Sequence, residues 1–307
     1  MYHIIINPKS RTGHGLKVWN IVKNHLDEKE IVYTSHFTHY EFHATKIAKA
    51  ICEENEGMKH IIVLGGDGTV NEVINGIECY QDVMLGYIPS GSSNDLARSL
   101  NISNDPLTAL NEILNSHSYP YYDHGILHID HTDKPRKFSV STGIGFDAAI
   151  CYEALNSKIK KALNVMKLGK LTYVLIAIKQ LVRYQPTDGE LIIDAKRIIT
   201  LKNIFFISSM IHPYEGGGLK MDPHANPSDH KLSVCIFYDI PKYKAAIILP
   251  LLYFGKHTDF KGVKIVECET VEIHTKSELL VHTDGEFAGR TNHINVTCTK
   301  EQIRMLL

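Results

Sequence analysis

A glycine-rich turn between an apolar strand pattern and a helical pattern constrains the fold of this chain more than any other feature. Residues 61–64 are continuously apolar, residues 65–69 read Gly-Gly-Asp-Gly-Thr, and helical spacing begins at Val70. Glycine lets a backbone come close to an anion and adopt positive φ, and a following helix offers free N–H groups and the positive end of its dipole. The turn is therefore predicted to bind phosphate groups.

Asp67 stands in the middle of this turn, where a carboxylate and a phosphate would repel one another. A Mg²⁺ ion held between the two groups would remove that repulsion, because Mg²⁺ binds both carboxylate and phosphate oxygens. In the alternative interpretation, residues 65–69 form an ordinary tight turn in which Asp67 and Thr69 only cap the helix. The position of the turn directly between a strand and a helix favours phosphate binding.

Polar residues also follow three other predicted strands. Residues 7–13 come after the first strand, Thr38 after the second, and residues 89–95 after the fourth. Ligands of an open parallel sheet bind outside the carboxyl ends of its strands, so these loops are expected to line one crevice. The sequence G-x-x-x-x-G-K-[ST] does not occur in the chain, which excludes the P-loop class of ATPases.

The chain changes near Tyr121 from alternating strand and helix patterns to a series of strand patterns. Continuous apolar strands that alternate with helices predict a parallel sheet in an α/β domain. The rest predicts an antiparallel β domain, interrupted by a helical insert at residues 157–184. Its strand patterns cover residues 125–129, 138–141, 190–193, 198–208, 232–238, 263–265, 271–275, 279–282 and 294–298. A chain of 307 residues is long enough for two such domains.

Charge and hydropathy exclude several classes of protein. The net charge is -1, without the basic bias of a nucleic-acid-binding protein, so no nucleic-acid partner is expected. The six cysteines are scattered and form no C-x-x-C pair, which is typical of reduced thiols in the cytoplasm. The N-terminus lacks a signal-peptide pattern, and the longest uncharged apolar run, residues 245–254, is half of the ~20 residues of a spanning helix. We expect a soluble, cytoplasmic protein that contacts membranes only peripherally.

Short motifs spread over nearly the whole chain resemble the diacylglycerol kinase catalytic family, which includes sphingosine kinases and bacterial lipid kinases. The matching motifs are Asn7-Pro8-x-Ser10, Gly65-Gly66-Asp67-Gly68-Thr69-x-Asn71-Glu72, Gly91-Ser92-Ser93-Asn94-Asp95-Leu96-Ala97-Arg98, Tyr122-Asp123, Thr142-Gly143-Ile144-Gly145 and Asp284-Gly285-Glu286. The last motif lies far from the first, which makes the resemblance specific. NAD kinases and phosphofructokinases are more distantly similar and share the Gly-Gly-Asp-Gly turn.

The resemblance implies an N-terminal α/β nucleotide-binding domain with a Rossmann-like parallel sheet and a C-terminal, antiparallel β-sandwich-like domain. The active site would lie in the cleft between them. The first domain is expected at residues 1–122, completed by the C-terminal tail at residues 296–307, and the lipid-binding domain at residues 123–295. The residues that the resemblance places against ATP are Asn7, Ser10, Thr38, Gly65, Gly66, Asp67, Gly68, Thr69, Asn71 and Ser92.

The resemblance also implies catalytic and metal-binding residues. Glu286 matches the general base that accepts the proton of the lipid hydroxyl, Asp284 lies beside it, and Asp67 holds Mg²⁺ against the phosphates. In the alternative interpretation, residues 284–286 form only a solvated Asp-Gly hairpin turn. The residues implied to bind Mg²⁺ are Asp67, Asp95 and Asp123 in a carboxylate–water network, and Asp229 with the carbonyls of Asn226 and Lys231 in a structural loop.

Two positions depart from the family pattern. Ser92-Ser93 stands where Thr-Gly is commoner, which keeps one hydroxyl but changes the turn. His230 stands where glycine is usual in the structural metal loop. If that position needs a positive φ, a histidine there costs conformational energy, although histidine tolerates it better than most residues.

These features predict a lipid kinase that uses ATP and Mg²⁺ to convert diacylglycerol to phosphatidic acid, a step of phospholipid biosynthesis. A sphingoid base or undecaprenol would present a similar hydroxyl, and an NAD kinase-like enzyme or a catalytically silent nucleotide or lipid sensor would share the glycine turn. The insert at residues 157–184 has the pattern of a basic amphipathic helix, which either lies on the inner face of the membrane or packs on its own domain. An exposed strand edge would support a homodimer.

Overall fold

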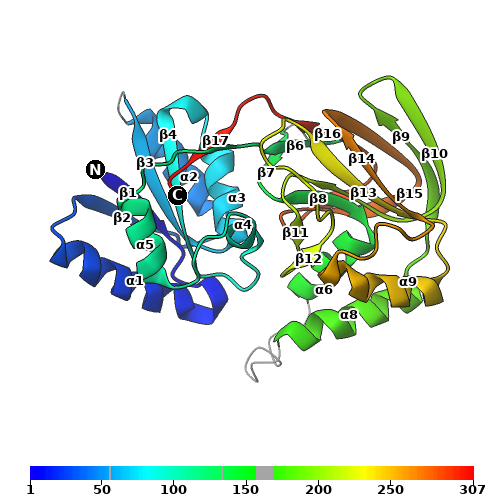
Figure 1. The fold of residues 1–307 in the computed structure, drawn as a ribbon, viewed down its shortest axis with the longest axis horizontal. Helices are drawn as coiled ribbons and strands as arrows, with labels where there is room; N and C mark the ends of the chain where they lie inside the picture. Colours follow the sequence, from blue (N-terminus) through cyan, green and yellow to red (C-terminus); the bar gives the residue numbers. More distant parts are fainter. Residues whose placement is uncertain (55–56, 131, 133, 157–168) are drawn as a thin grey trace.

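The computed structural model describes residues 1–54, 57–130, 132, 134–156 and 169–307, and it shows two domains side by side (Figure 1). The first domain is built on a six-stranded, mainly parallel sheet, and the second on a nine-stranded antiparallel sheet. This architecture confirms the predicted fold class. Within the described residues, no helix has both the length and the apolar character needed to cross a membrane.

The strands of the first sheet lie in the order β2-β1-β3-β4-β17-β5. Their bounds are β1 (Tyr2–Ile6), β2 (Tyr33–Phe37), β3 (Lys59–Gly65), β4 (Val83–Pro89), β5 (Tyr121–Tyr122) and β17 (Ile303–Met305). The side chains of Ile5, Ile62 and Val63 are fully buried, because helices cover both faces of the sheet (Figure 1). A continuous apolar pattern is what strands in such a sheet require.

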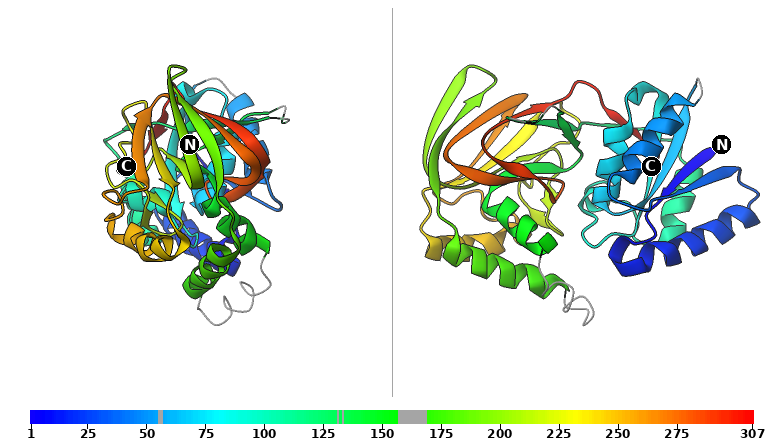
Figure 2. Two further views of the ribbon diagram at one scale, coloured as in Figure 1. Left: turned by 90° about the vertical axis from the view of Figure 1, so that its right-hand side faces the viewer. Right: turned by 180° about the vertical axis from the view of Figure 1, so that it is seen from behind.

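The helices of this domain follow the strands in turn. They are α1 (Ser10–Glu28), α2 (His43–Glu53), α3 (Asp67–Gly76), the 3₁₀ helix η1 (Tyr80–Asp82), α4 (Asp95–Ser99) and α5 (Pro106–Leu114). α1 packs beside α5, and α2 packs beside α3 on the other face of the sheet (Figure 2). Because α1, α3 and the turn before α4 follow β1, β3 and β4, their N-terminal ends gather at one edge of the sheet.

The end of the chain returns to the first domain. Strand β17 lies between β4 and β5, and Arg304 pairs with Met84 in parallel orientation. The preceding strand, β16 (Glu286–Cys298), still belongs to the second sheet. Residues 296–298, which the sequence suggested as part of the completing tail, therefore lie in the second domain, because the buried side chain of Val296 packs in that domain's core.

The second sheet has the order β14-β13-β10-β8-β15-β16-β6-β7, and β9 pairs with both β10 and β15. The bounds of the other strands are β6 (Gly125–Ile129), β7 (Arg136–Phe138), β8 (Ser141–Gly145), β9 (Thr187–Ile193), β10 (Arg197–Met210), β13 (Leu232–Tyr238), β14 (Val263–Cys268) and β15 (Thr270–Thr283), and a small hairpin consists of β11 (Tyr214–Glu215) and β12 (Leu219–Lys220). The patterns at residues 271–275 and 279–282 are parts of one strand, β15, whose pairing with β16 is irregular between His274 and Leu279.

The helices of the second domain gather at one end of its sheet (Figure 1). They are α6 (Phe146–Asn156), α8 (Gly169–Arg183), α9 (Lys242–Ile248) and the 3₁₀ helix η2 (Leu249–Phe254). Of the insert predicted at residues 157–184, residues 157–168 lie outside the described residues, and α8 covers most of the rest. The sequence did not predict α6, because its apolar residues follow no single stripe.

Candidate active site

The glycine turn between β3 and α3 faces a second glycine turn that follows β4. A Cβ on Gly91 would lie 2.6 Å from the Cα of Gly66, so the two backbones touch and no larger residue fits at position 91 without a shift. A Cβ on Gly65 would lie 2.5 Å from the Cβ of Thr69. These glycines are needed for the close approach of backbone segments, and they leave the N-terminal turn of α3 facing a cavity.

This first cavity has a volume of about 280 Å³ and lies at the carboxyl ends of β1, β3 and β4. Asn7 donates from Nδ2 to Thr69 Oγ1 at 3.1 Å, and Ser10 Oγ lies 2.7 Å from Ser90 Oγ, so side chains tie the successive strand ends together. The lining residues are Asn7, Ser10, Arg11, Glu41, Phe42, Gly66, Gly68, Thr69, Asn71, Glu72, Gly91, Arg136 and Glu286.

Four of the residues that the resemblance placed against ATP do not line the first cavity. Thr38 follows β2, and its N–H donates to the carbonyl of Ile6 at 2.8 Å, but its side chain is buried outside the cavity. Ser92 and Asp67 line a second cavity instead, and Gly65 lines neither cavity.

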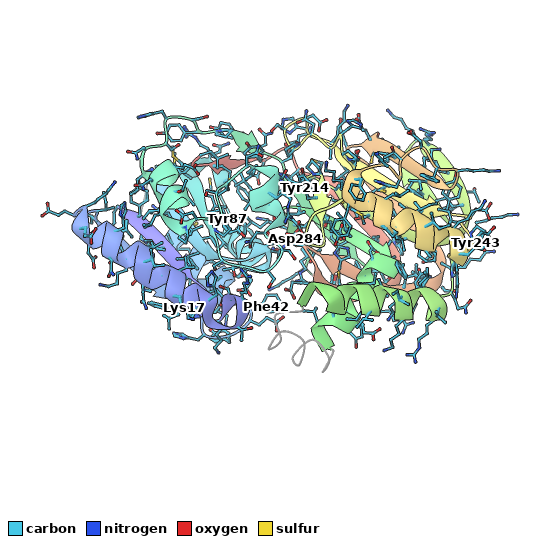
Figure 3. All side chains as sticks on the ribbon, turned by 60° about the horizontal axis from the view of Figure 1, so that its bottom comes forward. Lys17, Phe42, Tyr87, Tyr214, Tyr243 and Asp284 are labelled. Carbon is cyan, nitrogen blue, oxygen red and sulfur yellow. The ribbon has the colours of Figure 1, made fainter. Side chains whose placement is uncertain are left out.

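The second cavity has a volume of about 210 Å³ and lies between the two domains. The first domain contributes Gly66, Asp67, Gly68, Ser92, Ser93 and Asp95, and the second contributes Val140, Ser141, Cys151, Ala154, Leu155, Glu215, Gly216, Asp284, Gly285 and Glu286. Gly66, Gly68 and Glu286 line both cavities, so the cavities meet at the glycine turn. Figure 3 shows Asp284 and Tyr214 between the domains and Phe42 on the facing edge of the first domain.

Glu286 lies at this junction. It begins β16, and its Oε1 lies 3.2 Å from the place that a Cβ on Gly68 would occupy. The carboxylate of the second domain therefore lies over the glycine turn of the first domain, within reach of groups bound in either cavity. Residues 284–286 do form a hairpin turn between β15 and β16, but this turn faces the other domain and not open solvent.

Asp284, next to Glu286, has both carboxylate oxygens occupied by protein donors. Oδ1 accepts the N–H groups of Val140 and Ser141 at 2.8 and 3.0 Å. Oδ2 accepts Asn71 Nδ2 at 2.8 Å, the N–H of Ser139 at 2.8 Å and its hydroxyl at 3.1 Å. The sequence suggested Asp284 as a catalytic residue, whereas this geometry fits a carboxylate that positions the turn.

Asp67, in the glycine turn, is oriented by the second turn. Its Oδ2 accepts the N–H of Asp95 at 3.0 Å, and its Oδ1 accepts the N–H of Leu96 at 3.2 Å. Burial and then the charge of Asp95 raise the pKa of Asp67 to about 7. Asp95 itself accepts the N–H of Gly217 at 2.7 Å and pairs with Arg98, and burial raises its pKa.

The surroundings of Asp67 fit a Mg²⁺ ion by their chemistry. Asp67 and Asp95 line the same cavity and offer oxygen atoms, which are the ligands that Mg²⁺ prefers. Burial, and after it the negative charge of Asp95, disfavours the ionised form of Asp67 and so raises its pKa. A divalent cation at this point would offset that charge.

Asp123 lies with the loop at residues 226–231. Its Oδ2 accepts the N–H of His230 at 2.7 Å, and its Oδ1 accepts Gln302 Nε2 at 2.7 Å. In the described part of the chain, Asp123 makes no direct hydrogen bond to Asp67 or Asp95. Of the three carboxylates suggested for one network, the structure brings only Asp67 and Asp95 into direct contact through hydrogen bonds.

The loop at residues 226–231 has the backbone conformation that a glycine would favour. His230 has a φ of 60°, in the left-handed region, although its side chain is a histidine. A cavity of about 10 Å³, lined in part by Asn226, Asp229 and Lys231, lies beside the loop, and a volume of this order holds one water-sized sphere. The three residues suggested for the structural metal thus share one small cavity.

A buried cluster of ionisable residues lies directly behind the second cavity, and sequence reasoning did not find it. His282 Nε2 lies 3.2 Å from Asp147 Oδ2 and 3.3 Å from Glu215 Oε1, and its Nδ1 accepts the N–H of Gly285 at 3.3 Å. Burial raises the pKa of Asp147. One sequence feature could have drawn attention to Glu215, because three glycines follow it directly. The backbone of this glycine run contacts the first domain, where the N–H of Gly217 binds Asp95.

The fold and the site together define a two-domain protein in which a glycine turn between a strand and a helix of the parallel sheet faces an acidic turn of the antiparallel domain. Residues 1–122 match the family model described as the diacylglycerol kinase catalytic domain. Residues 143–306 match the model described as the YegS C-terminal NAD kinase beta sandwich-like domain. The chain therefore belongs to the diacylglycerol kinase family, as its motifs predicted.

Comparisons with individual proteins agree with this assignment. The chain is 29% identical over 293 residues to the candidate lipid kinase YtlR of Bacillus subtilis (strain 168), covering 94% of each chain. It is 26% identical over 256 residues to the diacylglycerol kinase of the same organism, covering 80% of each.

Two solved structures share the fold. The structure of a candidate diacylglycerol kinase from Bacillus anthracis str. Sterne has a TM-score of 0.78 at 21% identity, covering 99% of this chain and 96% of that one. The structure of an NAD kinase from Archaeoglobus fulgidus in complex with ATP has a TM-score of 0.52 at 10% identity, covering 100% of this chain and 94% of that one.

Proposed function

We propose that this chain is a lipid kinase that transfers the γ-phosphoryl group of ATP to the hydroxyl of diacylglycerol and so forms phosphatidic acid. The observation that carries the proposal is the position of Glu286, which lies over the glycine turn where the two cavities meet. Phosphoryl transfer depends on an in-line arrangement of donor and acceptor and on the neutralisation of charge. Two cavities that meet at one carboxylate suit that arrangement.

ATP occupies the first cavity in this proposal. The turn at residues 65–69 and the N-terminus of α3 offer backbone N–H groups to the phosphates. Asn7 and Ser10 add an amide and a hydroxyl from the end of β1 and the start of α1, where a bound nucleotide would extend away from the turn. Diacylglycerol occupies the second cavity, where Ala154, Leu155 and Val140 provide apolar surface.

Asp67 would hold Mg²⁺ in this arrangement, with Asp95 beside it. When bound, the ion supplies positive charge that offsets the charge of the phosphates during transfer. The backbone N–H groups of Asp95 and Leu96 keep the Asp67 carboxylate oriented. The carboxylate of Asp229 and the carbonyls of Asn226 and Lys231 would hold a second, structural ion.

Glu286 accepts the proton of the attacking hydroxyl in this proposal. Asp284 holds the turn on which Glu286 lies, and Asn71 ties that turn to α3. The proton acceptor and the glycine turn are thus fixed relative to one another, although they belong to different domains.

The lipid is reached at the inner face of a membrane, and α8, α9 and η2 form the surface that contacts it in this proposal. α8 buries Ile176 in its own domain but also exposes apolar side chains to solvent. The exposed apolar residues are Leu175, Ile178 and Val182 on α8, Tyr243 and Ile247 on α9, and Phe254 on η2. Lys242 Nζ donates to the carbonyl of Val182 at 2.7 Å, which keeps α8 and α9 side by side (Figure 3). Flotation with liposomes that contain or lack anionic lipid tests this surface.

A panel assay with labelled ATP and Mg²⁺ tests the function. Diacylglycerol, a sphingoid base, undecaprenol and NAD are offered separately, and products are separated by chromatography. Labelled phosphatidic acid is the expected product. Transfer to another lipid, or to NAD, contradicts the proposed acceptor, and ATP binding without transfer to any acceptor supports a nucleotide sensor. A homodimer through an edge strand such as β2 stays a prediction that size-exclusion chromatography tests.

A further inference from the structure

The second sheet carries a cluster of metal-binding side chain types that line neither cavity of the active site. Glu272 and His274 lie on one face of β15, because they are two residues apart. His293 lies on β16, directly opposite His274 in the antiparallel pairing. One oxygen of Glu272 and one ring nitrogen of each histidine all lie within 4.8 Å of one another.

We propose that Glu272, His274 and His293 bind one Zn²⁺ ion or a similar first-row divalent metal ion, with solvent as the fourth ligand. Two imidazoles and one carboxylate form a ligand set that suits Zn²⁺ and that differs from the oxygen-only sets of Mg²⁺. The side chains have exposed fractions of 38% for His274, 24% for His293 and 33% for Glu272, so an ion from solution reaches them.

The distances in the cluster suit one small cation. Glu272 Oε1 lies 2.7 Å from His274 Nε2 and 2.9 Å from His293 Nε2. Bonds of ~2.0 Å to a tetrahedral ion would separate the ligand atoms by roughly 3.3 Å, so the side chains need to open by about half an ångström. The two rings stack with centroids 4.1 Å apart and planes 8° apart, which points both Nε2 atoms toward the same carboxylate.

Asp130 gives the second, independent reason for a cation. Its Oδ2 lies 2.6 Å from His293 Nδ1, and an ionised carboxylate can only accept a hydrogen bond, so Nδ1 carries the proton. A neutral ring then has its lone pair on Nε2, where it faces Glu272, which is also an acceptor. A metal ion between Nε2 and Glu272 satisfies both atoms. A carboxylate that holds the outer nitrogen of a ligating histidine is the usual support of a zinc site.

The buried cluster of His282, Asp147 and Glu215 has the opposite arrangement. Nδ1 of His282 accepts the N–H of Gly285, so a neutral ring carries its proton on Nε2, between the two carboxylates. No lone pair of that ring is left for a metal ion. The orientation of the ring therefore assigns the metal to the cluster on β15 and β16 and not to the buried one.

A metal ion in this cluster would join three strands. Glu272 and His274 belong to β15, His293 to β16, and Asp130 follows β6, which pairs with β16. A ligand that binds only the folded chain stabilises it by mass action. Bound Zn²⁺ is therefore expected to raise the melting temperature of the protein.

The test uses the full chain without a histidine tag, in excess Mg²⁺ so that oxygen-only sites are filled. Zn²⁺ is titrated by calorimetry, and Co²⁺ is added as a spectroscopic probe. We expect one equivalent of Zn²⁺ to bind and Co²⁺ to give a tetrahedral spectrum. This spectrum should lack a thiolate band, which excludes binding at the exposed thiol of Cys79. His274→Ala and His293→Ala are expected to abolish this binding, and Asp130→Asn to weaken it about 10–100-fold.

His117→Ala is the matched control, because His117 is an exposed histidine outside the cluster. It is expected to bind Zn²⁺ like the wild type, and circular dichroism checks that every variant is folded. The proposal is overturned by the absence of saturable Zn²⁺ binding, or by binding that persists when both His274 and His293 are replaced. An NMR titration that finds His293 doubly protonated at neutral pH and unaffected by Zn²⁺ also overturns it.

Discussion

Asn71 Nδ2 lies 2.8 Å from Asp284 Oδ2, and this hydrogen bond joins the helix behind the glycine turn to the hairpin that carries Glu286. Asn71 belongs to α3 of the first domain and Asp284 to the turn after β15 of the second. The same Asn71 amide donates to the carbonyl of Lys137 at 2.9 Å, also across the domain boundary. Asn75, one turn further along α3, also exchanges hydrogen bonds with the backbone of Lys137 at 2.9 Å, so the two asparagines together hold the glycine turn near the hairpin of Glu286.

Removing either partner of this pair should reduce both stability and activity. Asp284→Ala leaves backbone N–H groups of residues 139–141 without their acceptor, and we expect a loss of about 3 kcal/mol in the free energy of unfolding. Asn71→Ala should cost about 1–2 kcal/mol. Urea unfolding of both single variants and the double variant measures the coupling, which we expect at about 1 kcal/mol. Strictly additive effects would contradict a direct role of the pair.

Glu286→Gln should abolish phosphoryl transfer while ATP still binds. The amide keeps the shape of the side chain but cannot accept the proton of the hydroxyl, and we expect kcat to fall about 10²–10⁴-fold. Transfer of labelled phosphate measures kcat, and calorimetry measures ATP binding. Glu278→Gln is the control, because Glu278 is an exposed residue of the same strand β15. Near-normal turnover of Glu286→Gln would remove Glu286 from the role of base.

Asp67 should link stability to pH and to Mg²⁺. Its pKa rises from an ordinary value of 3.8 to about 7 in the folded chain, so the folded chain binds this proton more tightly than the unfolded chain. The corresponding stability is fully present below the unfolded pKa and is lost as pH rises through about 7. Without divalent metal, the wild type should therefore lose more stability between pH 5 and 8 than Asp67→Asn does.

Added Mg²⁺ should restore the melting temperature of the wild type at pH 8, because the ion offsets the charge of Asp67. Asp67→Asn should gain much less. Thermal unfolding at both pH values, with and without Mg²⁺, measures these shifts. An equal response of the two proteins to Mg²⁺ would exclude Asp67 as the main ligand.

The sequence predicted those parts of the molecule that local chemistry determines. The turn at residues 65–69 and the turn at residues 284–286 are each defined by adjacent residues, because glycine and Asp-Gly pairs favour turns wherever they occur. Their positions relative to the strands of the sheet followed from the apolar pattern alone.

Partners that are distant in the chain were not predictable in this way. The five donors around Asp284 come from residues 71 and 139–141, which approach it because β8 pairs with β15 and α3 packs at β7. The hydrogen bond from the N–H of His230 to Asp123 depends in the same way on the fold, which brings the loop at residues 226–231 beside Asp123. A pattern in one sequence does not contain the order of strands in a sheet.

His282 should position the catalytic turn through the N–H of Gly285. We expect His282→Ala to lower the free energy of unfolding by about 3–5 kcal/mol, because it leaves two buried carboxylates without their partner. His282→Gln keeps a donor and an acceptor, and it should recover part of the lost stability and of kcat, with an unchanged KM for ATP. Steady-state kinetics and thermal unfolding of both variants measure this. A glutamine variant as impaired as the alanine variant would contradict the positioning role.

His230→Gly should stabilise the protein, which is the reverse of the usual effect of glycine. His230 has a φ of 60°, and a left-handed conformation costs an L-residue roughly 1–2 kcal/mol, whereas glycine adopts it freely but is more disordered in the unfolded chain. The bond from the backbone N–H of residue 230 to Asp123 is kept in the variant. We therefore expect a net gain of about 0.5–1 kcal/mol in urea unfolding. His224→Gly is the control, because His224 is exposed, belongs to the same segment and has no positive φ; this variant should lose about 0.5–1 kcal/mol of stability. A loss of stability at both positions would show that the His230 imidazole stabilises the fold by more than its backbone strain destabilises it.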